Sequence, residues 1–203
     1  MAKQKIIMMP SDTGYDLAAA EYDKKEAYLN SFEKNRILPF FGDLKNRTIL
    51  DVGAGTGRLS IALAKKGAKV TALDSSAEML KVLSKKDRSV KVQIGDAESL
   101  PFDDNSFDFV LAAFLVVHLK DPSRFFDEAY RVLKDGGRLI VTNINQKEPP
   151  EIETPKGTIK IESYYHRPEK IRDLLQSLAF DIKDEIIIRE KDVWVNQIII
   201  AQK

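Results

Sequence analysis

The sequence predicts an α/β fold in which helices cover both faces of a mostly parallel sheet. Residues 49–59, ILDVGAGTGRL, read as a β-branched strand, a tight glycine turn and the start of a helix. Further strand-like and helix-like segments alternate as far as residue 142. Among them, residues 107–114 are apolar at nearly every position, which is typical of a central parallel strand covered on both faces.

The glycine turn after the first strand predicts a ligand crevice. Gly53, Gly55 and Gly57 allow backbone torsions that a Cβ would forbid, and the following helix offers free N–H groups. In the dinucleotide fingerprint, the third glycine would stand where this chain has Arg58. Asp51 inside the turn would repel phosphate, whereas it suits a ligand with an amino group and a sulfonium. The turn alone leaves another nucleotide, or no ligand, open.

The second strand, residues 69–73, ends at Asp74, and a helix follows at once. Ser75 and Glu78 have capping-box spacing at the start of this helix. An acid at this strand end faces the crevice, where one carboxylate can accept from two vicinal ribose hydroxyls. The alternative interpretation is that Asp74 only helps to cap the helix.

The third strand, residues 90–94, leads into a loop that contains Asp96, Ala97 and Glu98. The Asp96 side chain offers an acceptor beside the Ala97 N–H donor, a pair complementary to a ligand edge that presents an amino donor beside an acceptor. A polar loop without a ligand is the alternative. The fourth strand, residues 107–114, comes next.

A helix and a fifth strand complete the core. Asp121 and Pro122 are expected as the cap and the first helical residue, and the helix is expected to run through residue 133. Residues 134–137, KDGG, are expected to end it as a glycine stop. The fifth strand is predicted over residues 138–142.

Taken in order, these features resemble one enzyme family. The glycine turn is similar to motif I of the class I S-adenosylmethionine-dependent methyltransferases. The phrase HLKDPSRFFDEAYRVLKDGGRLIV resembles their type 11 branch, which includes ubiquinone- and menaquinone-type C-methyltransferases. With Asp74 and the Asp96 loop, the resemblance runs from residue 48 to residue 142. It implies a Rossmann-like, seven-stranded, mostly parallel sheet with helices on both faces and a C-terminal antiparallel β-hairpin.

The resemblance also implies a reaction. It is methyl transfer from S-adenosyl-L-methionine to a small-molecule acceptor by in-line displacement, which leaves S-adenosyl-L-homocysteine and needs no metal. Whether the accepting atom is O, N or C stays open. The residues implied to bind the cofactor are Asp51, Gly53, Ala54, Gly55, Gly57, Asp74, Ser75, Met79, Asp96, Ala97, Glu98, Ala113 and His118.

A general base is needed only if the acceptor arrives protonated. His118 and His166 are the only histidines, and an unperturbed imidazole can act as a base near neutral pH. His118 is the first candidate because it lies just past the fourth strand, at the crevice end. The alternative is that it packs under the next helix or only lines the cofactor pocket. Tyr22 and His166 are the further catalytic candidates.

The chain is expected to form a single methyltransferase domain with three parts. Residues 1–45 are predicted as an N-terminal helical cap, residues 46–142 as the cofactor-binding core, and residues 143–203 as a substrate-side loop, a helix and a terminal strand pair. In the cap, Tyr15 and Tyr22 stand seven residues apart on nearly one helix face, where a hydroxyl can touch the cofactor or the acceptor. The alternative is an amphipathic helix whose tyrosines pack and expose their tips.

The C-terminal part is expected to select the acceptor. Three prolines within residues 143–165 indicate a loop and a short strand over the pocket. A helix is expected from residue 168 to about 178 without its usual cap, because Arg167 cannot accept an N–H. Tyr165 and Arg167 are candidate acceptor contacts, with His166 or Arg167 facing an anionic acceptor. The alternative is that water molecules accept from the free N–H groups at the start of this helix, without any acceptor contact. Residues 181–203 predict two strands around a turn near residues 191–192.

Composition narrows the function classes. The net charge of +1 gives no general attraction to nucleic acid. There is no cysteine, which excludes disulfides and thiolate zinc sites, and no Asp/Glu/His spacing suggests a metal site. The longest apolar run, around residues 109–117, is too short to cross a bilayer, so a cytoplasmic location is expected. The protein is expected to be a monomer or a homodimer. An RNA or protein methyltransferase, a non-catalytic S-adenosylmethionine-binding domain and an NAD-dependent enzyme remain as alternatives.

Overall fold

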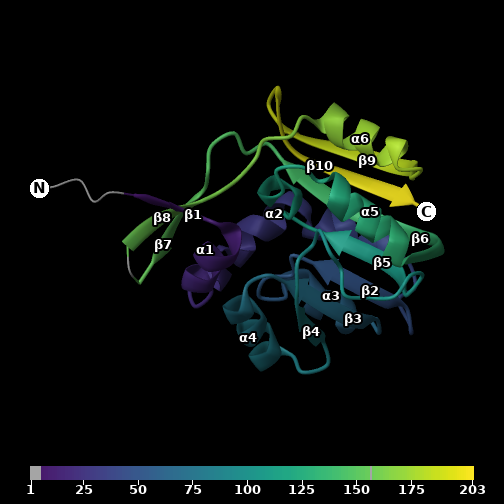
Figure 1. Cartoon of the computed structure of the whole chain (residues 1–203), viewed down its shortest axis with the longest axis horizontal. Helices are drawn as coiled ribbons and strands as arrows, with labels where there is room; N and C mark the ends of the chain where they lie inside the picture. The colour runs from purple at the N-terminus through teal and green to yellow at the C-terminus, as the bar shows by residue number, and fades with distance from the viewer. Residues whose placement is uncertain (1–5, 156) are drawn as a thin grey trace, which may run out of the picture.

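The computed structural model describes residues 6–155 and 157–203. Its centre is a seven-stranded sheet with the order β4-β3-β2-β5-β6-β10-β9 (Figure 1). The strands from β2 to β6 run parallel, while β10 pairs antiparallel with both β6 and β9. This confirms the predicted mostly parallel sheet with a terminal hairpin. Its strands are β2 (Thr48–Val52), β3 (Lys69–Asp74), β4 (Lys91–Ile94), β5 (Phe107–Ala112), β6 (Leu133–Ile144), β9 (Asp181–Glu190) and β10 (Val193–Gln202).

Helices cover both faces of this sheet because successive strand residues point to opposite sides. On one face, Phe126 of α5 and Ile171 of α6 are buried in a cluster with Leu50 of β2. On the other face, Leu63 of α3 is buried in a cluster with Ile49, the neighbour of Leu50 on the same strand. The α-helices that flank the sheet are α2 (Glu26–Ile37), α3 (Arg58–Ala64), α4 (Ala77–Lys86), α5 (Ser123–Val132) and α6 (Pro168–Ser177).

The connection between α5 and β6 differs from the prediction. β6 begins directly after the helix, so residues 134–137, the expected glycine stop, lie inside the strand. The register against β5 shifts there, because Phe107 pairs with Leu133 whereas Phe109 pairs with Arg138. The KDGG segment is therefore an irregularity of an early-starting strand, in which extra residues leave the ladder.

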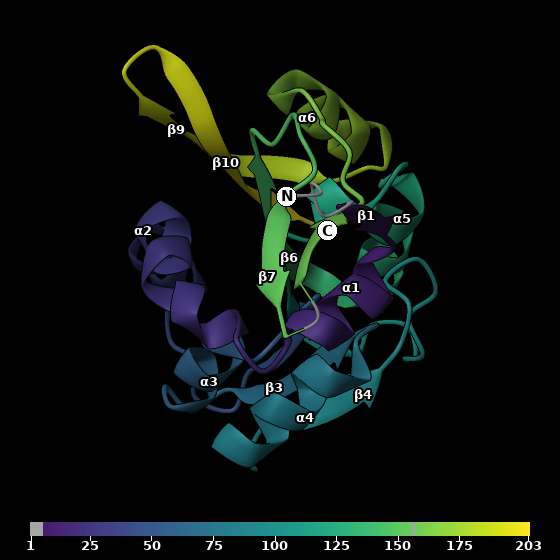
Figure 2. The ribbon, with the colours of Figure 1, turned by 90° about the vertical axis from the view of Figure 1, so that its left-hand side faces the viewer.

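A second sheet, with the order β1-β8-β7, lies to one side of the large sheet (Figure 1). Figure 2 views the molecule from that side, with α1 and β7 toward the viewer. Ile152, Ile159 and Ile161 of this sheet bury Ala18 of α1. The sequence predicted one short strand in this region and none before residue 10. The elements are β1 (Ile7–Met9), α1 (Ser11–Ala18), β7 (Glu151–Thr154) and β8 (Gly157–Ile161), with the 3₁₀ helices η1 (Tyr22–Lys25), η2 (Leu38–Phe41) and η3 (Val116–His118) elsewhere.

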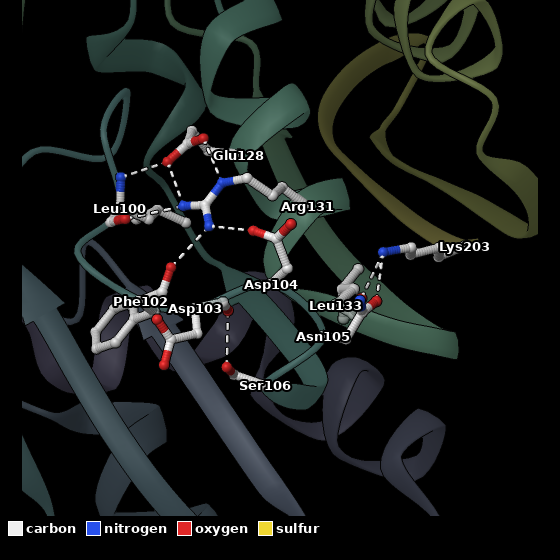
Figure 3. Close-up of polar contacts among 10 residues, drawn as sticks. All are labelled: Leu100, Phe102, Asp103, Asp104, Asn105, Ser106, Glu128, Arg131, Leu133 and Lys203. Carbon is white, nitrogen blue, oxygen red and sulfur yellow. Dashed lines mark hydrogen bonds and ion pairs between the residues drawn. The ribbon is translucent and has the colours of Figure 1, made fainter.

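Arg131 of α5 stabilises the loop between β4 and β5 through hydrogen bonds and an ion pair (Figure 3). Its guanidinium donates to the carbonyls of Leu100 and Phe102, at 2.9 and 2.7 Å. It also pairs with Glu128 at 2.8 Å, and that carboxylate accepts from the Leu100 N–H at 2.7 Å. One ion pair thus satisfies several backbone groups of the loop, which stabilises the segment that follows residues 96–98.

The C-terminal elements follow the prediction closely. No side chain caps the start of α6 at Arg167, and the hairpin turn contains Lys191 with a φ of 53°. Within residues 6–155 and 157–203, no helix combines the length and the apolar character needed to cross a membrane.

Substitution of Gly57 tests how tightly the glycine turn packs on α4. A Cβ at Gly57, where φ is 85°, would lie 2.1 Å from Cδ1 of Leu83, whereas a Cβ at Gly55, where φ is 56°, meets nothing within 4 Å. We expect Gly57→Ala to lower the free energy of unfolding by about 2–4 kcal/mol, through backbone strain and overpacking together. Gly55→Ala is expected to lower the free energy of unfolding by about 1–2 kcal/mol, because it introduces backbone strain without overpacking. Urea unfolding of both variants measures the difference, and equal losses would contradict this packing.

Candidate active site

The main crevice lies at the carboxyl ends of β2 to β5, where parallel strands place their ligand sites. Its cavity volume is about 530 Å³. Every residue implied to bind the cofactor lines it except Gly57, which lies beneath as the N-cap of α3. The lining residues of that set are Asp51, Gly53, Ala54, Gly55, Asp74, Ser75, Met79, Asp96, Ala97, Glu98, Ala113 and His118.

The glycine turn folds back onto β3 through its backbone. The N–H groups of Gly53 and Ala54 both donate to the Leu73 carbonyl, at 2.8 and 3.1 Å. The Gly55 N–H donates to the Asp74 carboxylate at 2.7 Å. Gly53 and Gly55 have φ values of 72° and 56°, which residues with a Cβ adopt only at a cost. The turn therefore presents bare backbone to the crevice.

Asp74 is held by backbone donors. Besides the Gly55 N–H, it accepts from the Ser76 N–H at 2.8 Å. Burial raises the pKa of Asp74, and these two hydrogen bonds oppose the rise because they stabilise the ionised form. The helix cap differs from the prediction by one residue. Ser76, rather than Ser75, is the N-cap of α4, and its Oγ accepts from the Met79 N–H at 3.2 Å.

Asp51 lies under the turn and is 2% exposed. Its carboxylate accepts from the Ser60 hydroxyl at 2.6 Å. Burial raises the pKa of Asp51 to about 7, although the Ser60 hydrogen bond and the nearby Arg58 reduce the rise. Near neutral pH this carboxyl is therefore balanced between its protonated and ionised forms, and a cation beside it would favour the ionised one.

Arg58 offsets the charge of these acids only in part, because another carboxylate engages it. Its guanidinium pairs with the buried Glu33, donates to Oδ1 of Asn30 at 3.1 Å and lies over the Phe114 ring at 5.5 Å. Among the described residues that line the crevice, it is the one Lys or Arg side chain. The acids lining the same crevice are Asp12, Asp51, Asp74, Asp96 and Glu98. This excess of negative groups suits a cationic ligand.

The loop after β4 is shaped by its own hydrogen bonds. The Asp96 carboxylate accepts from the Glu98 N–H at 2.9 Å, and Asp96 and Ser99 form an isolated β-bridge. Ala97 between them is 8% exposed. The loop thereby holds Asp96 and Glu98 at the rim of the crevice, in agreement with the predicted position.

Tyr15 and His118 form a hydrogen-bonded pair at the crevice wall. His118 Nδ1 lies 2.9 Å from the Glu162 carbonyl, which can only accept, so Nδ1 carries the proton. His118 Nε2 is then the acceptor, and the Tyr15 hydroxyl donates to it at 2.9 Å. Burial lowers the pKa of His118 and raises that of Tyr15, so both groups are neutral near pH 7.

Tyr22 reaches the same wall from an element other than the predicted one. α1 ends at Ala18, and Tyr22 lies in η1, so the two tyrosines do not share one helix face. Their rings still meet edge to face, with centroids 5.7 Å apart. Burial raises the pKa of Tyr22 to about 12, which keeps its hydroxyl protonated.

A second cavity of about 610 Å³ lies beyond this wall. Tyr15, Tyr22, Phe114 and His118 line both cavities. Most of the other side chains around the second cavity are apolar. They come from α2, η3, the end of β6, β7, the segment that joins these two strands, and the terminal hairpin. These residues are Leu29, Val117, Ile144, Asn145, Gln146, Pro150, Ile152, Glu190, Val193, Trp194 and Val195.

Three predicted site residues stand apart from both cavities. His166 is 3% exposed, and its Nε2 lies 2.8 Å from the Leu119 carbonyl, so it serves packing rather than the crevice. Tyr165 and Arg167 line a separate hollow between α6 and the hairpin. Sequence reasoning missed Trp194, which lines the second cavity; the signal was the single tryptophan of the chain, placed beside the predicted hairpin turn.

Comparison with known proteins decides the family. Residues 50–141 match the family described as "Methyltransferase domain". Over 135 residues the chain is 36% identical to a demethylmenaquinone methyltransferase from Renibacterium salmoninarum, covering 64% of this chain and 57% of that protein. Over 157 residues it is 32% identical to the Thermotoga maritima enzyme of the same name, covering 74% of this chain and 66% of that protein. The chain thus spans less than two thirds of the length of each of these relatives.

The chain belongs to the type 11 group of the class I S-adenosylmethionine-dependent methyltransferases. A solved S-adenosylmethionine-dependent methyltransferase from Methanosarcina mazei resembles this methyltransferase with a TM-score of 0.69 and 25% identity. That similarity covers 81% of this chain and 97% of the solved one. The family resemblance identified over residues 48–142 is therefore confirmed.

The two histidines of this methyltransferase allow a direct test of the Tyr15–His118 pair. Tyr15→Phe removes a hydrogen bond that stabilises neutral His118, so the pKa of His118 should rise toward its ordinary value of about 6.5. His166 should titrate as before, since it does not touch Tyr15. An NMR pH titration of both imidazoles measures this. A His118 pKa that stays constant or falls in the variant would contradict the assigned hydrogen bond.

Proposed function

We propose that this chain transfers a methyl group from S-adenosylmethionine to a small apolar acceptor. The observation that carries the proposal is the wall shared by the two cavities, formed by Tyr15, Tyr22, Phe114 and His118. The cavity on one side is acidic and contains the glycine turn, and the cavity on the other side is mainly apolar. A donor and an acceptor placed in them meet at this wall, where proximity and alignment supply much of the rate of a displacement.

The crevice residues fit an adenosyl cation. Asp51 and Asp74 are carboxylates with hydroxyl or backbone partners, and no Lys or Arg side chain forms a salt bridge with either in the described part of the chain. Asp51 would face the ammonium group and Asp74 the ribose hydroxyls, while Asp96 and Ala97 would face the adenine edge. When bound, the cofactor supplies a methyl group on a sulfonium, whose thioether leaves without protonation.

Tyr15 and His118 would take a proton from a protonated acceptor. The acceptor proton moves to the Tyr15 oxygen while the Tyr15 proton moves to His118 Nε2, and the imidazolium keeps its Nδ1–H bond to the Glu162 carbonyl. Because burial lowers the pKa of His118, its imidazolium form is unfavourable, and it would give the proton up to water after the transfer. His118 would thus act as the base, while Tyr15 would contact the acceptor.

The second cavity supports an apolar acceptor with little charge. Val117, Ile152 and Trp194 are among its lining residues, and Glu190 is its one carboxylate among the described residues. Two relatives are named demethylmenaquinone methyltransferases, which makes a quinone-type ring the first acceptor to test. A net charge of +1 favours such a molecule over bulk RNA.

An acceptor assay tests this function. Purified protein with labelled S-adenosylmethionine is offered fractionated cell metabolites, reduced demethylated quinones, RNA and a mixed peptide library, and mass analysis locates the added methyl group. We expect transfer to an apolar small molecule and none to RNA or peptides. Preferential labelling of RNA or peptides would overturn the acceptor class, and the absence of S-adenosylhomocysteine in every arm would overturn the activity.

Asp74→Ala tests the cofactor assignment. We expect the affinity for S-adenosylhomocysteine to weaken by about 1–3 kcal/mol, because hydrogen bonds to a charged partner are lost. Asp87→Ala is the matched control at the other end of α4, where the carboxylate accepts only from its near neighbour Ser89 among the contacts described. Calorimetry measures both affinities. An unchanged affinity in a folded Asp74→Ala protein would remove this residue from the ribose role.

A further inference from the structure

Two Tyr-Asp pairs occur in the N-terminal segment, at residues 15–16 and 22–23. Each tyrosine lines both cavities, and each aspartate leaves the cavity to contact the cofactor-binding core. Adjacent residues on a helix point about 100° apart, which allows Tyr15 and Asp16 to meet different neighbours. The segment therefore carries two functional side chains and two anchoring side chains in one repeated arrangement.

Asp16 caps a helix that belongs to another part of the chain. Its Oδ1 accepts from the Ser76 hydroxyl at 2.6 Å and from the Glu78 N–H at 3.1 Å, both at the start of α4. Ser76 also donates its N–H to Asp74 at 2.8 Å. A short chain of hydrogen bonds thus links α1, which carries Tyr15, to the acid at the end of β3.

Asp23 makes a second attachment at the glycine turn. Its Oδ1 accepts from the hydroxyl of Thr56, a buried residue between Gly55 and Gly57. Its other oxygen pairs with Lys86 at 2.5 Å, and the same ammonium group donates to the Thr56 carbonyl at 3.1 Å. This attachment therefore holds η1 against the turn that lines the crevice.

The attached segment forms part of the crevice wall. Pro10, Ser11, Asp12, Tyr15 and Tyr22 all line that cavity. The remainder of α1 packs on the small sheet, where Ala18 is buried with Ile152 and Ile161. The side-chain contacts of Asp16 and Asp23 thus fix how closely the segment approaches the crevice, although neither aspartate lines the cavity.

We propose that Asp16 and Asp23 are positioning residues that form a two-point latch over the cofactor crevice. The latch holds residues 11–25 closed and thereby places Tyr15 and Tyr22 between the two cavities. Because Asp16 bonds to Ser76 and Asp23 to Thr56, ligand binding at Asp74 and the glycine turn is coupled to the formation of the Tyr15–His118 pair. This inference rests on the proposed function for its purpose, whereas the contacts that form the latch lie entirely within the chain.

The test compares Asp16→Ala, Asp16→Asn and the control Glu21→Ala. Alanine favours helix, so Asp16→Ala removes the attachment to α4 without weakening α1 itself, and leaves the Asp23 attachment in place. Asparagine keeps an oxygen that can accept from Ser76 and Glu78. Glu21 lies between the two pairs in sequence, is exposed and pairs with its near neighbour Lys24, so its removal changes the charge by the same amount without touching the latch. The readouts are amide hydrogen exchange in residues 11–18 and affinity for S-adenosylhomocysteine.

In ligand-free Asp16→Ala we expect exchange over residues 11–18 to be about tenfold faster, and the affinity to be about tenfold weaker. Asp16→Asn should recover part of both effects, and Glu21→Ala should match the wild type. Unchanged exchange in folded Asp16→Ala, or an equal effect in Glu21→Ala, would overturn the latch. Failure of the wild type to bind S-adenosylhomocysteine would overturn the proposed function instead, while the ligand-free exchange comparison would still decide the latch.

Discussion

The crevice depends on buried carboxylates, at the place where we propose that a cation binds. Asp51 and Asp74 receive hydrogen bonds from a hydroxyl and from backbone N–H groups, which stabilise their negative charge without cancelling it. Arg58 would cancel part of it, but Glu33 engages the guanidinium. Burial raises the pKa of Asp51 from its ordinary value of 3.8 to about 7, so the fold loses stability as the pH rises from the first value to the second. A cationic ligand offsets that loss.

The central sheet brings these charges together. β2 and β3 are parallel neighbours, with Asp51 paired to Ala72 and Val52 to Leu73, so the turn after one strand meets the acid that ends the other. Both faces of the sheet are packed with apolar side chains, and a ligand finds room only where the backbone leaves the strands. The N-terminal segment then closes this edge and contributes the wall between the two cavities. In the proposed function, binding, alignment and proton removal therefore all depend on this one junction.

Local patterns were enough to predict the core of this site, but not the contacts between distant segments. Asp74 was predicted to face the crevice because it stands at the end of a parallel strand, and it lines that cavity. By contrast, nothing local indicates that the Tyr15 hydroxyl bonds to His118, 103 residues away. The helix cap was placed one residue early because Ser75 stands three residues before Glu78. In the structure, Ser76 accepts from the Met79 N–H and also contacts Asp16 of another element. The small β1-β8-β7 sheet was largely missed for the same reason.

The pH dependence of S-adenosylmethionine affinity tests the electrostatic account most directly. The pKa of Asp51 is about 7 in the free crevice, and a bound cation favours its ionised form. The affinity should therefore rise between about pH 5.5 and pH 7, a range in which the ligand's own amino group, with a pKa of about 7.7–8.0, stays protonated. Asp51→Asn should bind more weakly and lose that rise. A wild-type affinity that does not change over this range, or the same slope in Asp51→Asn, would contradict the account.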